Sequence, residues 1–167
     1  MKTIRVLIID EHPAVCQALT SRLGAVPSMT VVDAMSDFSE GLHSVGKLQP
    51  DVILLGLKVK GKSRRRRRDL DPGKAVDMLK ASSTASVIVL TTYLDDAERE
   101  RALSAGAQRY LLKQIDTAHL VSEIEAVVSA ERGAWSLPEG ERRFPLLLSD
   151  RHAKLDKVAD HIQERDK

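Results

Sequence analysis

Short apolar runs and helix-spaced apolar residues alternate along most of the chain. The runs are rich in Val, Ile and Leu and continuous, which is typical of strands that are buried on both faces of a parallel sheet. The strands predicted in this way cover residues 5–9, 30–34, 52–55, 87–90 and 110–112.

Between these strands, apolar residues recur at intervals of three and four, the spacing that places them on one face of a helix. Pro13 suits a first helical residue, Asp71-Pro72 suits the start of another helix, and Gly24 and Gly133 are expected to end helices, Gly24 as a left-handed cap. The helices predicted from this spacing cover residues 13–24, 39–48, 71–79, 95–105 and 120–133.

Five strand and helix pairs therefore fit within the first 133 residues. This alternation predicts an α/β fold: a doubly wound, five-stranded parallel sheet, (βα)5, with helices on both faces. We expect one domain over residues 1–133, a linker over 134–148 and a C-terminal helical extension over 149–167. This last helix is predicted to be amphipathic, and its apolar face is expected either to pack back on the domain or to join a second protomer.

Composition agrees with an ordinary globular protein, since 43% of the 167 residues are hydrophobic and 30% are charged. Cys16 is the single cysteine and is expected to be a small packed side chain, which favours a reducing compartment. No apolar stretch approaches transmembrane length, so we expect a cytoplasmic protein with no membrane partner.

The net charge of +2 hides an uneven distribution. Residues 58–68 hold eight of the 26 basic residues, which leaves 18 basic against 24 acidic residues elsewhere. The body of the protein is therefore acidic, and a basic insertion over about residues 58–70 interrupts it.

In open parallel sheets, ligands bind beyond the carboxyl ends of the strands. The residues that the predicted strands place at this edge include two acids, a glycine, a hydroxyl residue and a lysine. They are Asp10, Glu11, Gly56, Thr91 and Lys113.

Three segments around these residues resemble the receiver domains of two-component response regulators. Residues 6–13 are similar to the first strand and acidic pair of that family, residues 87–92 to its fourth strand and hydroxyl residue, and residues 105–113 to its Gly-Ala…Tyr-Leu-x-Lys signature. The subfamily it resembles most is the one often called NarL/FixJ. The resemblance implies a flavodoxin-like fold and a role in two-component phosphorelay signalling. We expect no enzymatic activity, because the sequence contains neither a Gly-x-x-x-x-Gly-Lys phosphate loop nor a dinucleotide-binding fingerprint.

By this resemblance, Asp10 and Glu11 match the pair that holds Mg²⁺, and Thr91 and Lys113 match the residues that bind the phosphoryl oxygens. Tyr110 matches the aromatic residue that changes rotamer on activation. The family's phosphoacceptor aspartate is missing, because its place is taken by Gly56. Glycine has no carboxylate to form an acyl phosphate or to bind a metal, so no catalytic residue is expected and Mg²⁺ binding should be weakened.

Simpler interpretations of the same residues remain open. Asp10 and Glu11 could be acids favoured at the start of a helix, and Thr91 and Lys113 could be solvated loop residues. Their order at successive strand ends favours a retained receiver pocket. Without the acceptor, an ion pair between Lys113 and Asp10 could replace the metal, with the modest value of a partly exposed pair.

The basic insertion contains a run of five arginines. Like charges that repel each other predict a solvated, disordered loop. An arginine could instead enter the vacated metal site, or the run could bind phosphates of nucleic acid or of a cyclic dinucleotide. The run consists of Arg64, Arg65, Arg66, Arg67 and Arg68.

The sequence therefore predicts an atypical receiver, a pseudo-receiver, that signals through phosphorylation-independent protein contacts. By resemblance to the family, the fourth helix, fifth strand and fifth helix are expected to bind a protein partner or a second copy as a homodimer. The alternative function is binding of a phosphate ligand through the arginine run.

Overall fold

The computed structural model describes residues 3–56 and 70–135. Within them, strands and helices alternate as the sequence predicts, and the predicted fold class is confirmed. The elements are β1 (Ile4–Ile9), α1 (Pro13–Gly24), β2 (Met29–Met35), α2 (Phe38–Leu48), β3 (Val52–Gly56), α3 (Pro72–Ser82), β4 (Ser86–Thr91), α4 (Asp96–Ser104), β5 (Arg109–Leu112) and α5 (Thr117–Trp135).

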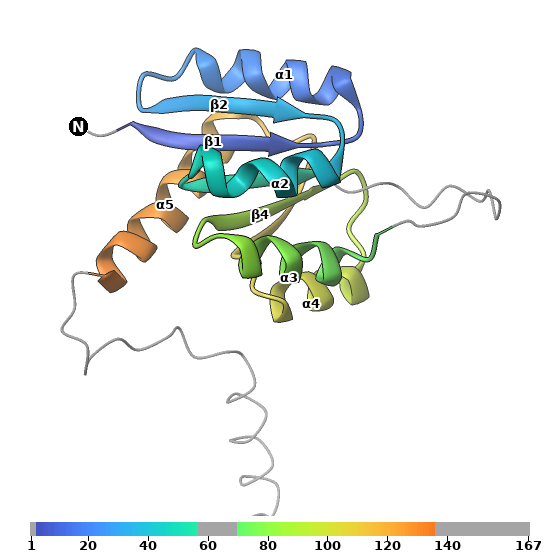
Figure 1. The fold of residues 1–167 in the computed structure, drawn as a ribbon. Coiled ribbons are helices and arrows are strands. Elements are labelled where there is room, and N and C mark those ends of the chain that lie inside the picture. The colour runs from blue at the N-terminus through green and yellow to red at the C-terminus, as the bar shows by residue number, and fades with distance from the viewer. Residues whose placement is uncertain (1–2, 57–69, 136–167) are drawn as a thin grey trace, which may run out of the picture. The chain divides into compact units, whose positions relative to one another are not determined.

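The five strands form one parallel sheet in the order β2-β1-β3-β4-β5 (Figure 1). The register aligns the carboxyl ends of neighbouring strands: Ile9 pairs with Leu55, and Gly56 pairs with Leu90. Asp51 lies at the opposite edge, where its carboxylate accepts a hydrogen bond of 2.8 Å from the backbone N–H of Arg5.

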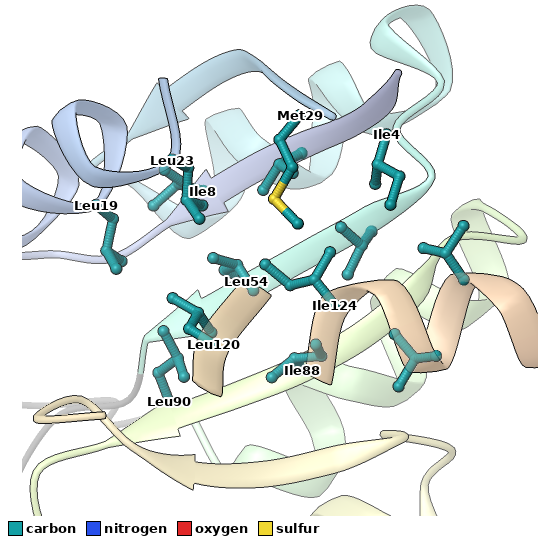
Figure 2. Close-up of a cluster of buried hydrophobic side chains, with 14 of the residues drawn as sticks. Ile4, Ile8, Leu19, Leu23, Met29, Leu54, Ile88, Leu90, Leu120 and Ile124 are labelled. Carbon is teal, nitrogen blue, oxygen red and sulfur yellow. The ribbon is translucent and has the colours of Figure 1, made fainter. Parts of the chain in front are cut away.

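Two hydrophobic clusters hold helices against the two faces of the sheet. One face packs on α1 and α5 through residues such as Leu19, Leu54 and Ile124, which Figure 2 shows converging between helix and sheet. The other face packs on α2, α3 and α4 through residues such as Val45 and Leu79. The sheet lies in the first of two compact units, which ends at Ser129, and the second unit begins at Ala130.

The predicted ends of α1 and the predicted start of α3 are right, whereas the left-handed cap at Gly24 and the helix end at Gly133 are wrong. Asp71 caps α3 as expected, since its carboxylate accepts a hydrogen bond of 3.2 Å from the backbone N–H of Lys74. Gly24 is the last residue of α1 and has no positive φ, and α5 continues past Gly133. A left-handed helix cap is made by Gln49 after α2, with φ of 45°.

Several predictions fall outside the described residues. They concern the arginine run, most of the linker and the C-terminal helix over residues 149–167. Of the helices that the structure does describe, none combines the length and apolar composition that a bilayer-spanning segment needs.

Candidate functional site

The carboxyl edge of the sheet brings together residues that are far apart in the sequence. Asp10 directly follows β1, Gly56 and Thr91 end β3 and β4, and Lys113 directly follows β5. Backbone hydrogen bonds fix two of these positions, from the Asp10 N–H to the Met35 carbonyl at 3.0 Å and from the Lys113 N–H to the Thr91 carbonyl at 2.7 Å. The parallel sheet therefore places the predicted pocket residues at one edge.

The Asp10 side chain is held by the chain that follows it. Its Oδ1 atom accepts a hydrogen bond of 2.9 Å from the backbone N–H of His12, the local turn that aspartate commonly forms two residues ahead. The Nδ1 atom of the His12 ring lies 3.1 Å from the same oxygen. Asp10 is only 1% exposed, so its carboxylate is fixed inside the protein rather than presented to solvent.

Lys113 reaches the other oxygen of the same carboxylate. Its Nζ atom lies 2.5 Å from Asp10 Oδ2, so the predicted ion pair is present. The two side chains are 8% and 1% exposed, which differs from the partly exposed pair that the sequence led us to expect. The pair is buried, and removing one member would leave the other charge without compensation.

Gly56 lies against this ion pair. A Cβ atom added at Gly56 would lie 1.7 Å from Asp10 Oδ2 and 2.3 Å from Asp10 Cγ. Real Cβ atoms never approach other atoms so closely. The Asp10 carboxylate therefore occupies the space that a side chain at the end of β3 would need.

The hydroxyl of Thr91 is turned to its own loop. It donates a hydrogen bond of 2.9 Å to the carbonyl of Tyr93 and accepts one of 3.3 Å from the N–H of Tyr93. Thr91 is 3% exposed, so the interpretation as a solvated loop residue does not hold, but these hydrogen bonds tie its hydroxyl to the backbone that leads into α4.

Tyr110, the predicted switch aromatic, points into the protein. It is 7% exposed, and its hydroxyl donates a hydrogen bond of 3.3 Å to Glu98 of α4. Burial raises the pKa of the Tyr110 phenol, and the nearby negative charge of Glu98 raises it further. The hydroxyl therefore links β5 to α4 in its protonated form.

The residues at this edge do not fit the Mg²⁺ site that the resemblance implies. One Asp10 oxygen is taken by His12 and the other by the Lys113 ammonium group, and Gly56 offers no carboxylate. The Glu11 side chain is 28% exposed, and its Oε1 atom lies 4.0 Å from the His12 ring. In the described ranges, no group of three or more His, Cys, Asp or Glu is arranged to hold a metal.

The sequence did not single out His12 or Glu98 as functional residues. His12 lies two residues after Asp10, the spacing at which a backbone N–H commonly donates to an aspartate carboxylate. This spacing was the signal that could have identified His12. Glu98 is one of several acids on α4, and nothing in the sequence distinguishes it as the partner of Tyr110.

Cys16, expected to be a packed side chain, is buried beside the site. Its thiol donates to the backbone carbonyl of Asp10 at 3.2 Å, and burial raises the pKa of the thiol. The thiol therefore supports the backbone and stays protonated.

Comparison with known proteins identifies the fold and the family. Residues 6–125 match the response regulator receiver domain. The chain is 36% identical over 129 residues to the transcriptional regulatory protein LiaR of Bacillus subtilis, an alignment that covers 77% of this chain and 57% of LiaR. It is 30% identical over 132 residues to the response regulator protein VraR of Staphylococcus aureus, covering 78% of this chain and 58% of VraR.

Among solved structures, a two-component response regulator of the LuxR family from Aurantimonas sp. SI85-9A1 superposes with a TM-score of 0.64 at 25% identity. The superposition covers 77% of this chain and 87% of that chain. Against the curated relatives, by contrast, the chain spans less than two thirds of their length.

Proposed function

This chain belongs to the response regulator receiver family of two-component systems, and from that premise we propose that it is an atypical receiver that signals through protein contacts without accepting a phosphoryl group. Receiver domains are in general signalling domains rather than enzymes. The observation that carries the proposal is Gly56 at the end of β3, in the place where the family has its acceptor aspartate. We also assign the protein to the cytoplasm, where response regulators usually act.

The chemistry of phosphoryl transfer supports this proposal. An acyl phosphate forms only when a carboxylate oxygen can reach the donor phosphorus with suitable alignment. The carboxylate of Asp10 lies against position 56, but its two oxygens are engaged by His12 and Lys113, and the side chain is 1% exposed. Asp10 is therefore a poor substitute for the missing acceptor.

We assign partner binding to the face formed by α4, β5 and α5. The hydrogen bond from Tyr110 to Glu98 joins β5 to α4 and holds the aromatic ring inside this face. Tyr93 and Leu94, in the loop before α4, are 71% and 51% exposed and add apolar surface beside this face. Aromatic and apolar side chains of this kind commonly contribute to protein interfaces.

The proposal predicts association that is independent of phosphodonor. The self-association of the full chain is measured by sedimentation velocity, and its capture of protein partners is measured by affinity purification, each with and without acetyl phosphate and Mg²⁺. We expect the same association state and the same partners under both conditions. A donor-dependent change in either would contradict the proposal. Leu94→Asp is expected to weaken the association, whereas Met78→Asp, an exposed substitution on α3, serves as the matched control.

The arginine run supports a second candidate function, binding of nucleic acid or a cyclic dinucleotide. Five consecutive guanidinium groups, Arg64 to Arg68, suit bidentate contacts with phosphate. Binding to a labelled DNA duplex is measured across a salt titration, and it should weaken steeply as salt rises and disappear when the five arginines are replaced by Gln. Binding that is absent or insensitive to salt would exclude this function.

A further inference from the structure

The position of Asp10 gives Gly56 a second role beyond the loss of a phosphoacceptor. We propose that glycine is required at position 56 because the Asp10 carboxylate fills the space there, and that the Lys113 ammonium group supplies the positive charge that a divalent cation supplies in other receivers. Asp10, Lys113 and His12 thus fill the pocket through their contacts with one another, and we call these three residues the lock. This inference deepens the proposed function, since it concerns how the same pocket is regulated.

Steric exclusion is the first part of the lock. The three heavy atoms nearest to a Cβ at position 56 all belong to Asp10, at 1.7, 2.3 and 2.8 Å. The side chain cannot simply swing away, because Oδ1 is held by the His12 N–H and Oδ2 by Lys113. Any residue other than glycine must therefore displace Asp10 from its partners.

Charge compensation is the second part. A carboxylate that is 1% exposed is strongly destabilised unless a positive charge accompanies it. Apart from their contact with each other, no hydrogen bond from a described residue reaches Asp10 Oδ2 or Lys113 Nζ, so each of these charges depends on the other. Lys113 follows β5 in the same chain, so its ammonium group contacts Asp10 without a binding step from solution. A cation from solvent would have to displace this ammonium group before it could bind Asp10.

Two consequences follow for the pocket. Mg²⁺ should not bind to the wild-type protein, because its site is filled by an ammonium group. Restoring a carboxylate with Gly56→Asp should not by itself restore a receiver, because the new side chain would compete with Asp10 for the same space.

The steric part is tested by Gly56→Ala in the full chain, with Gly46→Ala as the matched control. Gly46 is also a glycine, but a Cβ added there meets no atom within 4 Å. We expect Gly56→Ala to lower the melting temperature and to abolish the slowly exchanging ¹⁵N ammonium resonance of Lys113. Gly46→Ala, which lies inside α2, should keep that resonance and should not lower the melting temperature. If Gly56→Ala has the same melting temperature as the wild type and keeps that resonance, the inference is wrong.

The charge part is tested with Mg²⁺ alone, which keeps the inference falsifiable if Gly56→Ala fails to fold. Millimolar Mg²⁺ should not shift the amide resonances of Asp10 and Glu11 in the wild type, but it should shift them saturably in Lys113→Met. A saturable shift in the wild type would overturn the inference. If Mg²⁺ does not shift these resonances in Lys113→Met, the inference is also wrong, because Lys113 would then not be the group that excludes the cation.

These readouts separate the lock from the proposed function. A wild-type protein that binds Mg²⁺ and still takes no phosphoryl group would refute the lock alone. A protein that excludes Mg²⁺ but changes its association with acetyl phosphate would refute the proposed function alone.

Discussion

Replacing Lys113 by Met removes the ammonium group and keeps a side chain of similar length. In the wild type, Lys113 Nζ lies 2.5 Å from Asp10 Oδ2, and the two side chains are 8% and 1% exposed. The substitution leaves the Asp10 carboxylate buried without its counter-charge. We therefore expect a large loss of stability.

The burial of the pair sets the expected magnitude. Removing one member of a buried ion pair costs about 3–5 kcal/mol, whereas an exposed pair contributes about 0–1 kcal/mol. The ion pair between Arg101 and Asp71, at 2.9 Å, belongs to the second class, because its side chains are 43% and 45% exposed. Lys113→Met should therefore lose several times more stability than Arg101→Met, the matched control.

Urea unfolding followed by circular dichroism measures the difference. With a urea slope of about 2 kcal/mol per M, a loss of about 4 kcal/mol lowers the unfolding midpoint by roughly 2 M. The double variant Asp10→Asn, Lys113→Met should be more stable than Lys113→Met alone, because Asn carries no charge and keeps an acceptor for the His12 N–H. If Lys113→Met and Arg101→Met lose equal stability, the buried pair does not hold this pocket.

Three further predictions concern the packing around the site, and urea unfolding measures each. Tyr110→Phe should lose about 0.5–1.5 kcal/mol at neutral pH, because the hydrogen bond to Glu98 is removed. Burial raises the pKa of Tyr110 above the ordinary 10.0, so its contribution is complete below pH 10.0 and is lost as the pH rises through the folded-state pKa; the Phe variant should lack this alkaline loss. Leu54→Ala should cost about 2–5 kcal/mol, because Leu54 is fully buried in the sheet, and a smaller loss would mean that the core rearranges. Asp71→Ala should cost about 0.5–2 kcal/mol through the lost cap of α3, and an unchanged midpoint would show that the cap is dispensable.

The fold could be predicted from the sequence because its pattern is repetitive. Buried parallel strands produce continuous apolar runs, and the helices between them carry apolar residues at a different period. Helix ends were less predictable, because several local solutions compete. The left-handed cap was expected at Gly24, but Gly24 does not adopt that conformation, whereas Gln49 does.

The members of the site were predictable for a geometric reason. Parallel strands bring their carboxyl ends to one edge, so Asp10 and Lys113 were expected at the same edge of the sheet. Their contact did not follow from this, because β3 and β4 lie between β1 and β5. The side-chain arrangement was not predictable, because it depends on a space that the sequence does not show. Gly56 indicated the loss of a carboxylate, but only the structure shows that Asp10 fills the volume and becomes buried with Lys113.

The central claim is that this receiver takes no phosphoryl group, and mass spectrometry of the intact protein tests it most directly. The chain is incubated with acetyl phosphate and Mg²⁺, beside a receiver that carries the acceptor aspartate as a control for the donor. The account predicts an unchanged mass for this chain while the control gains one phosphoryl group. A stoichiometric, base-labile adduct on this chain would contradict it.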